Sequence, residues 1–245
     1  MSVSHPGGVD LNSDVGEGFG NWPGGPDEEL MPLLTSVNVA CGFHAGDPSI
    51  MRRTCDFAHQ HNCTIGAQVS YPDLPGFGRR FMDMRPSELT DAVVYQLGAL
   101  DAFARASGTT VRYVKPHGAL YNTIVEHEAQ ALAVVTALRD YDADLPMLGL
   151  PGSVVQRACE AAGVRFVTEG FADRAYTPEG RLVPRTQAGA LITDPPAAAD
   201  QAARLAKSGV ESICVHSDTP GAVAIVGAVA QSLTKLGYRL QPFVQ

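Results

Sequence analysis

Cysteine is scarce in this 245-residue chain, and its five cysteines follow no recognisable spacing. None forms a CxxC pair, and an odd number in a chain of this length argues against a disulfide framework. We therefore expect reduced and mostly buried thiols. Cys41 lies close to His44, as a nucleophile would, but it falls within an apolar run and a buried thiol is the better interpretation.

Basic residues are outnumbered and scattered. Lys and Arg number 18 against 26 Asp and Glu, which gives a formal net charge of -8, and no basic stripe is present that would suit nucleic acid. No apolar run approaches the roughly 20 residues that span a bilayer, and the start MSVSHPGG lacks a basic segment followed by an apolar core. We expect no nucleic-acid or membrane partner and a cytoplasmic location.

A nucleotide-binding P-loop is also missing. The pattern GxxxxGK[ST] occurs nowhere, and the glycine-rich PGFGRR at Pro75–Arg80 does not match it. Two adjacent arginines in this stretch, Arg79 and Arg80, could hold a carboxylate or phosphate through paired hydrogen bonds. A solvated basic turn is the equally favoured alternative.

What the chain does contain is an alternation of short apolar runs with longer helical patterns, which is typical of parallel strands joined by helical crossovers. We expect strands at Val9–Asn12, Ser36–Ala40, Thr64–Val69, Val111–Lys115, Pro146–Leu150, Arg165–Thr168, Ser212–His216 and Tyr238–Phe243. We expect helices at Pro48–His61, Pro86–Ser107, Val125–Arg139, Ser153–Ala162, Pro196–Ser208 and Pro220–Leu236.

This alternation predicts an α/β fold: a single (β/α) barrel that spans residues 1–245 as one catalytic domain, with seven strands closing around an irregular eighth. An open doubly wound sheet is the alternative. No linker or low-complexity tract marks a domain boundary. The segments Ser70–Arg85 and Gly170–Asp194 are too long for simple connections and predict functional loops.

Six of the predicted strands end in polar groups, at the place where parallel (β/α) folds collect their chemistry. These groups are Asp14, Glu17, His44, Asp47, Gln68, Tyr71, Asp73, Lys115, His117, Glu169, Asp173, His216 and Asp218. Any one of them could be structural, and Asp47 and Asp218 stand where a helix cap would. Three of the seven histidines, however, fall at strand exits beside an acid or a lysine, which favours a shared polar site.

The remaining histidines suggest no metal site. His5, His59, His61 and His127 are interpreted as surface residues, and no HExxH motif is present. A zinc or manganese ion held by Asp14, His44 and His216 is a weaker hypothesis, because imidazole and carboxylate suit these metals but the spacing does not require one.

Six segments of the chain, taken together and in this order, resemble the motifs of a known protein family. They are DLNSDVGEGFG (Asp10–Gly20), VNVACGFHAGD (Val37–Asp47), IGAQVSYPDLPGFGRR (Ile65–Arg80), VKPHGALYN (Val114–Asn122), EGFADRAY (Glu169–Tyr176) with GRLVPR (Gly180–Arg185), and CVHSDTPGAV (Cys214–Val223). In this order, over most of the chain, they resemble the LamB/YcsF family. Many relatives read GAHP where this chain has Gln68, and HGD where it has His216-Ser217-Asp218, so no histidine role carries over to position 68.

The resemblance implies a seven-stranded or distorted TIM-like barrel, similar to the glycoside hydrolase/deacetylase superfamily. It also implies a hydrolase of lactam utilisation, which takes part with subunits B and C of a 5-oxoprolinase in the ATP-dependent opening of 5-oxo-L-proline (pyroglutamate) to L-glutamate. Because the P-loop is missing, ATP with its Mg²⁺ would bind through unrecognised loops or in a partner protein. The sequence leaves a homo-oligomer open.

Lactam hydrolysis gives the candidate residues hypothetical roles. Lys115 and His117 would stabilise the carbonyl oxygen as it gains charge. Asp14 or Glu17 would activate water as a base, helped if burial raises its pKa. His44 and His216, each with a nearby aspartate, could be a base, an orienting group or a metal ligand. Glu169 completes the catalytic candidates, and the substrate-binding candidates are Asn12, Asp47, Gln68, Tyr71, Arg79, Arg80 and Asp218.

Two rival functions stay open. A metal-dependent amide or sugar deacetylase would act without ATP or partners and would lose activity on chelation. A non-catalytic subunit that presents a small acid to a partner would lose ligand binding, with no separable loss of turnover, in Lys115→Ala or His117→Ala variants.

Overall fold

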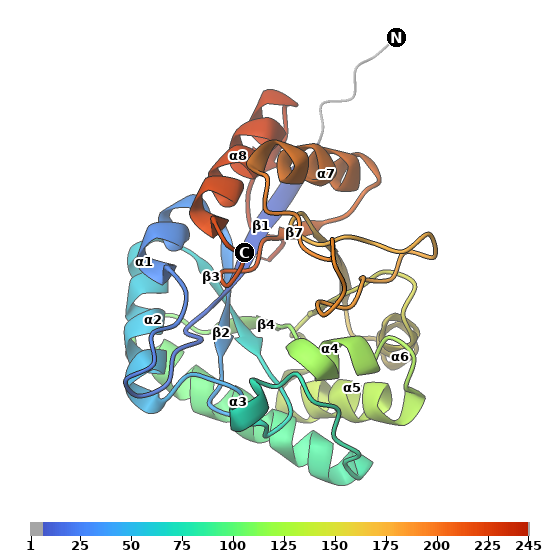
Figure 1. The fold of residues 1–245 in the computed structure, drawn as a ribbon. Helices are drawn as coiled ribbons and strands as arrows, with labels where there is room; N and C mark the ends of the chain where they lie inside the picture. The colour runs from blue at the N-terminus through green and yellow to red at the C-terminus, as the bar shows by residue number, and fades with distance from the viewer. Residues whose placement is uncertain (1–6, 245) are drawn as a thin grey trace.

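The computed structural model describes residues 7–244, and within them seven parallel strands close into a barrel (Figure 1). These strands are β1 Gly8–Val15, β2 Ser36–Ala40, β3 Thr64–Gln68, β4 Val111–Val114, β5 Met147–Gly149, β6 Phe166–Phe171 and β7 Ser212–Cys214. Each pairs with the next along the chain, and β1 pairs with both β7 and β2. The predicted barrel is confirmed, and the open doubly wound sheet is wrong because the ring leaves no free edge between β7 and β2.

An eighth strand lies outside the ring. The strand β8, Arg239–Leu240, pairs with Gly8 and Val9 at the beginning of β1, and is shorter than the predicted Tyr238–Phe243. Beyond it, Phe243 packs edge-to-face on Tyr113, with ring centroids 4.9 Å apart. The end of the chain therefore helps to close the amino end of the barrel, opposite the strand exits.

Successive side chains of β1 lie in two different environments, because side chains alternate along a strand. In β1, Leu11 and Val15 belong to the apolar core beneath the helices. Asp10, Asn12 and Asp14 instead hydrogen-bond to polar side chains of other strands. Burial raises the pKa of Asp10 to about 6, although three hydroxyl donors oppose the shift. This alternation delivers Asp14 to the carboxyl end of the barrel.

The main helices cover the outside of the barrel (Figure 1). They are α2 Pro48–Gln60, α3 Pro86–Ala106, α5 Glu128–Asp142, α6 Val154–Ala162, α7 Pro195–Lys207 and α8 Ala222–Lys235. The predicted cap of α2 is confirmed, since the Asp47 carboxylate accepts hydrogen bonds from the backbone N–H groups of Ser49 and Ile50 at 2.8 and 3.1 Å.

Two predicted helix starts are wrong by two or three residues. The helix α5 begins at Glu128 because His127 acts as its cap, and α8 begins at Ala222 because Gly221 adopts a positive φ of 78°. Asp218 therefore does not cap α8, contrary to the prediction.

Two short helices were not predicted, because they are too short to show a helical period. They are α1, Asp27–Leu30, which runs into a 3-10 turn at Met31–Leu33, and α4, Gly118–Thr123. A second 3-10 turn, Leu74–Gly76, lies in the predicted loop after β3. Gly118 has a positive φ of 56°, and a Cβ there would lie 2.5 Å from the Gly78 carbonyl oxygen, so glycine lets this loop pack tightly against the exit of β4.

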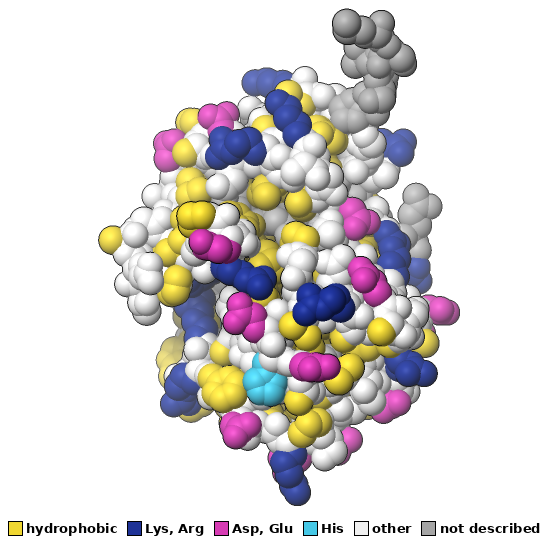
Figure 2. Space-filling model, turned by 90° about the vertical axis from the view of Figure 1, so that its right-hand side faces the viewer, with side chains coloured by type: hydrophobic (Ala, Val, Ile, Leu, Met, Phe, Trp, Pro, Cys, Tyr) yellow, Lys and Arg dark blue, Asp and Glu magenta, His cyan; other side chains and the backbone are white. Residues whose placement is uncertain are grey.

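The cysteines and the predicted surface histidines that the structure describes lie where the sequence analysis placed them. All five cysteines are buried and free, and burial strongly raises the pKa of Cys41, which disfavours a thiolate nucleophile. His59, His61 and His127 are exposed, while His5 lies outside the described residues. On the face in Figure 2, acidic and basic side chains are interspersed rather than grouped by sign. Within residues 7–244, no helix has the length and apolar character needed to cross a bilayer.

Candidate functional site

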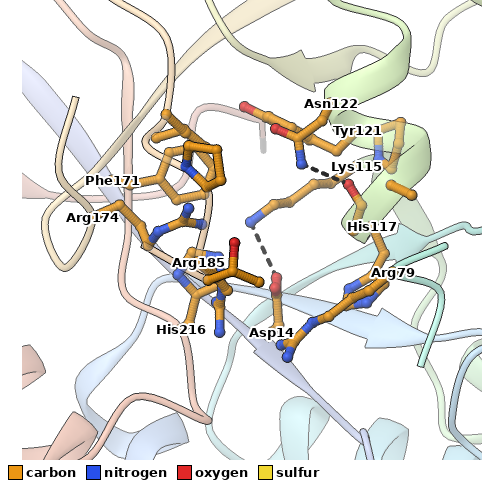
Figure 3. A pocket seen from close by; sticks show the side chains of 16 residues that line it. Asp14, Arg79, Lys115, His117, Tyr121, Asn122, Phe171, Arg174, Arg185 and His216 are labelled. Carbon is orange, nitrogen blue, oxygen red and sulfur yellow. Dashed lines mark hydrogen bonds and ion pairs between the residues drawn. The ribbon is translucent and has the colours of Figure 1, made fainter. Parts of the chain in front are cut away.

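A cavity of about 500 Å³ lies at the carboxyl ends of the strands (Figure 3). Asp14 reaches it from β1, Lys115 and His117 from the exit of β4, Phe171 from β6 and His216 from the exit of β7. The long loops after β3 and β6 complete its wall with Arg79, Arg174, Leu182, Pro184, Arg185 and Thr186. The predicted strand exits therefore do converge on one rim of the barrel.

A buried lysine stands at the base of this cavity. The Lys115 Nζ lies 3.1 Å from Asp14 Oδ1 and 2.8 Å from Glu169 Oε1. Burial alone would lower the pKa of Lys115, but Asp14, Cys214 and Glu169 outweigh it and raise the pKa well above its usual value. Lys115 is therefore an ammonium ion throughout the physiological pH range.

Asp14 behaves differently from the hypothesis that burial makes it a base. Burial favours a raised pKa, but the ammonium of Lys115, through its charge and its hydrogen bond, outweighs burial, and the pKa of Asp14 falls below its usual value. Asn38 also donates a hydrogen bond to Asp14 Oδ1 at 2.9 Å. The result is a firmly ionised carboxylate, suited to holding Lys115 rather than to accepting a proton.

His216 forms a dyad with Asp173 on the other side of the cavity. The His216 Nδ1 lies 3.0 Å from both Asp173 carboxylate oxygens, and the same carboxylate accepts bonds from the His216 backbone N–H at 3.1 Å and the Thr219 hydroxyl at 2.6 Å. Burial opposes ionisation of Asp173, but His216 and these hydrogen bonds keep its pKa low. Nε2 of His216 is left for the cavity, where the residue is one of the lining side chains.

The expected neighbour of His216 was Asp218, and that expectation is wrong. Asp218 turns to the mouth of the cavity, where it accepts hydrogen bonds from Arg79 and, at 2.8 Å, from Arg185. Burial favours a raised pKa of Asp218, but Arg185 and Arg79 lower it. The residue is thus a carboxylate that orients two arginines.

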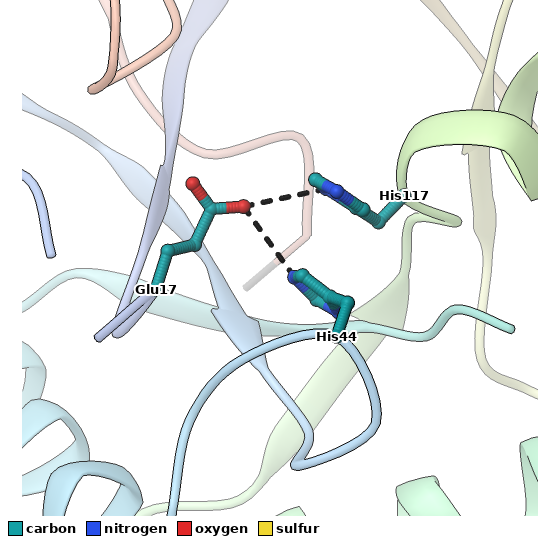
Figure 4. A group of neighbouring side chains, drawn as sticks. All are labelled: Glu17, His44 and His117. Carbon is teal, nitrogen blue, oxygen red and sulfur yellow. Dashed lines mark ion pairs between the residues drawn. The ribbon is translucent and has the colours of Figure 1, made fainter. Parts of the chain in front are cut away.

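A second polar group lies beside the cavity (Figure 4). His44 and His117 stack with ring centroids 3.9 Å apart, and Glu17 Oε1 lies 3.4 Å from His44 Nε2 and 3.3 Å from His117 Nδ1. Burial, then the neighbouring His44, lowers the pKa of His117 well below its usual value. The His117 Nε2 donates a hydrogen bond to the Phe77 carbonyl oxygen at 2.9 Å, so Nδ1 of the neutral ring carries a lone pair and can accept one.

Gln68 joins the three members of this group. Its amide nitrogen lies 2.8 Å from Glu17 Oε1 and 2.9 Å from His117 Nδ1, and its amide oxygen lies 3.2 Å from His44 Nε2. The NH₂ group must face the carboxylate, because the reverse orientation would set two oxygens against each other. The Gln68 NH₂ group therefore donates one hydrogen to the Glu17 carboxylate and the other to the lone pair of His117 Nδ1. These two donors take the place that a bound cation would occupy.

A metal fits this site only if Gln68 moves away. Within residues 7–244, the group whose ligand atoms lie within 4.8 Å of one another is Glu17, His44 and His117, rather than the predicted Asp14, His44 and His216. Imidazole and carboxylate suit zinc or manganese. The Gln68 amide, however, already satisfies the ligand atoms, so we derive no chemical step through a metal.

This arrangement predicts that a Gln68→His variant gains a metal site. Exchanging the amide for a fourth ligand should tighten Co²⁺ binding by at least about 100-fold, because even outer-shell changes alter metal affinity by about 10–100-fold. Visible absorption during a Co²⁺ titration measures the change. Adding His44→Ala to the variant should remove the site again, and wild-type protein that binds Co²⁺ as tightly as the variant would contradict the interpretation.

Several predicted substrate-binding residues lie away from the cavity. Arg80 is exposed and pairs with Asp73, and Asp47 caps α2 and accepts the Gly20 N–H at 2.7 Å. Tyr71 is buried and donates its hydroxyl to Gln130. Asn12 lies beneath Lys115, 3.4 Å from its Nζ. Of the two arginines of PGFGRR, only Arg79 lines the cavity.

Sequence reasoning gave no role to several residues of the cavity wall or to one member of the dyad. Asp173 was predicted at a strand exit without a role, and Phe171, Arg174 and Arg185 lie in the family-like segments but were assigned none. Phe171 stacks on His216 with ring centroids 5.1 Å apart. The signal for all four was their place in EGFADRAY and GRLVPR, since those segments form the wall.

Comparisons with known proteins identify the family and the fold. A model of the LamB/YcsF family matches residues 9–245. The A subunit of the 5-oxoprolinase of Kocuria rhizophila is 54% identical over 96% of this chain and 98% of the relative. A lactam utilization protein of Thermus thermophilus superposes with a TM-score of 0.91 at 39% identity, covering 96% of this chain and 100% of that one. A peptidoglycan N-acetylglucosamine deacetylase domain of Eubacterium rectale, with a TM-score of 0.53 and 14% identity over 100% of this chain and 91% of that one, shares the fold alone.

Proposed function

Since the chain belongs to the LamB/YcsF family, we propose that it is the A component of a 5-oxoprolinase, which opens the lactam of 5-oxo-L-proline to L-glutamate with hydrolysis of ATP. The relatives that bear this name, and the lactam utilization protein that shares the fold at 39% identity, support the activity. The observation that carries the proposal is the placement of a buried ammonium, Lys115, and a histidine–aspartate dyad, His216 with Asp173, around one cavity.

These groups match what lactam hydrolysis requires. Water adds to the lactam carbon, negative charge develops on the carbonyl oxygen, and the C–N bond breaks as the ring nitrogen takes up a proton. Lys115 would stabilise the developing charge, because an ammonium held in place by two carboxylates needs no rearrangement during the reaction. His216, oriented by Asp173, would take the proton from water and return it to the ring nitrogen.

In this proposal, the partner subunits would bind the ATP that the reaction consumes. An amide carbonyl resists attack, and transfer of the γ-phosphoryl group of ATP to its oxygen, with release of ADP, would make the lactam carbon more electrophilic. After water adds and the C–N bond breaks, the acyl phosphate that remains would be hydrolysed to glutamate and phosphate. Because this chain has no P-loop, we propose that subunits B and C bind ATP with its Mg²⁺ and activate the lactam. Such an assembly would work in the cytoplasm, where ATP is available.

Reconstitution tests the proposal. The purified chain is mixed with 5-oxo-L-proline, ATP and Mg²⁺, with and without subunits B and C, and glutamate and phosphate are followed. We expect glutamate only from the complete mixture. If glutamate never forms under any combination, the proposed activity is wrong.

The same assay separates the rival functions. Turnover of an acetylated sugar or amide by the chain alone, abolished by chelation, would identify a metal-dependent deacetylase. Lys115→Ala and His117→Ala variants that weaken the binding of 5-oxo-L-proline with no separable loss of turnover would identify a non-catalytic binding subunit.

A further inference from the structure

Arg174 is a buried cation with an unused hydrogen-bond donor. It is 6% exposed, and one of its terminal nitrogens donates to the Val183 carbonyl oxygen at 2.7 Å. Among residues 7–244, its Nε has no hydrogen-bond partner. Burial, then the neighbouring Arg185, lowers its pKa. A buried N–H without an acceptor is unfavourable, so the wall of the cavity offers a donor that a ligand could satisfy.

The cavity wall around Arg174 has more positive than negative charge. Arg79, Arg174 and Arg185 all line it, and Asp218 is the carboxylate that pairs with the first and the third. Asp173, the residue before Arg174 in the chain, is occupied by His216. This end of the site therefore has three guanidinium groups and one carboxylate that pairs with two of them, which leaves an excess of positive charge.

The opposite end of the cavity has no such surplus, because Lys115 is flanked by Asp14 and Glu169. Figure 3 shows Arg174 and Lys115 pointing toward the same space from different elements. An anion that enters the cavity is therefore drawn to the arginine end, which leaves Lys115 and His216 for the reacting carbonyl.

Arg174 is also held more rigidly than its two neighbours. Its backbone forms an isolated antiparallel bridge with Leu191, and Gln201 donates a hydrogen bond to its carbonyl oxygen at 2.7 Å. The side chains of Arg79 and Arg185 are 42% and 23% exposed. A donor fixed in advance in a buried site loses less entropy on binding, so Arg174 is the better anchor.

We propose that Arg174, assisted by Arg79 and Arg185, is the subsite for the carboxylate of the lactam substrate. This inference rests on the proposed function and deepens it, because it makes a carboxylate next to the ring nitrogen a requirement for productive binding. Guanidinium groups recognise a carboxylate through planar, paired hydrogen bonds. A phosphoryl group has similar chemistry and is the competing source of the anion.

Binding of two matched lactams tests the subsite without any variant. 5-Oxo-L-proline and 2-pyrrolidinone share the ring but only the first has a carboxylate. In calorimetric titrations of the full assembly, we expect 5-oxo-L-proline to bind at least about 30-fold more tightly, as expected for a charged group paired in a buried site. Equal affinities for the two lactams would overturn the subsite.

An Arg174→Gln variant assigns the effect to this residue. In the full assembly, KM for 5-oxo-L-proline should rise by about 30-fold or more, kcat should change less, and the affinity for 2-pyrrolidinone should stay the same. Arg174→Lys, which keeps the charge but loses the paired geometry, should give an intermediate KM. The exposed Arg80, which pairs with Asp73 outside the cavity, provides the control variant Arg80→Gln, with an unchanged KM.

Other outcomes are equally informative. If inorganic phosphate competes with 5-oxo-L-proline for wild-type protein and Arg174→Gln removes only the phosphate effect, the residue serves a phosphoryl group and the carboxylate proposal is wrong. If turnover proceeds and KM is unchanged in Arg174→Gln, the subsite fails while the proposed function stands. If 5-oxo-L-proline binds through Arg174 but glutamate never forms, the subsite stands while the function fails.

Discussion

A Lys115→Met variant should form glutamate at least about 10²–10³-fold more slowly than wild-type protein in the complete assembly, the loss that follows removal of one group that stabilises the oxyanion. Methionine keeps the length and apolar stem of the side chain but removes the ammonium that lies 3.1 Å from Asp14 and 2.8 Å from Glu169. The measurement is the initial rate of glutamate formation at saturating 5-oxo-L-proline and ATP. A Lys207→Met variant, at an exposed position near the end of α7, should keep the wild-type rate.

The variant should also be less stable, and a second substitution separates folding from chemistry. Without Lys115, two buried carboxylates face each other without a cation, which costs about 3–5 kcal/mol in comparable buried pairs. Adding Glu169→Gln removes one of the two charges, so the double variant should recover part of this stability in urea denaturation. It should not recover glutamate formation. Recovery of activity together with stability would mean that Lys115 only supports the fold.

The strands and their polar exits were predictable because both follow from local patterns. A mostly apolar segment such as Val37–Ala40 is buried as a strand where helices cover a parallel sheet, and the residues that follow it lie at the carboxyl end of the barrel. His44 reaches the site for this reason, as do Lys115 and His117. The fold therefore places these side chains before any detail of the loops is known.

The pairing of side chains was not predictable, because it depends on how distant loops fold. Asp218 is two residues from His216 in the chain and looked like its partner, yet Asp173, 43 residues away, makes the contact. The loop after β6 brings Asp173 there, and it is folded by contacts such as the Arg174–Leu191 bridge that have no sequence period. The same loop supplies Arg174 and Arg185 to the cavity.

The pKa of Asp14 shows a second limit of sequence reasoning. Burial, which the sequence suggests, would raise this pKa, but the structure places the ammonium of Lys115 beside the carboxylate, and the opposite shift results. The water-activating role that the sequence analysis gave to Asp14 is therefore proposed for His216, whose ring Asp173 orients. That reassignment makes the dyad the second group whose removal should have a large effect.

Replacing either member of the dyad should slow glutamate formation by about 10²–10⁴-fold, the range for loss of a positioned acid–base group. His216→Ala removes the group that moves the proton. Asp173→Ala leaves it in place but removes the carboxylate that fixes its ring, 3.0 Å from Nδ1. The rates are measured in the complete assembly at saturating substrate, and His59→Ala, an exposed position on α2, is the control with an unchanged rate.

The double variant distinguishes positioning from a general structural role. If Asp173 acts through His216, then Asp173→Ala should cost almost nothing further once His216 is already alanine, because there is no ring left to orient. A residue that merely stabilises the fold would add its own loss in either background. Additive losses in the His216→Ala and Asp173→Ala cycle would therefore contradict the dyad. Non-additive losses with KM unchanged would locate proton transfer at His216, at the end of the cavity that Lys115 shares.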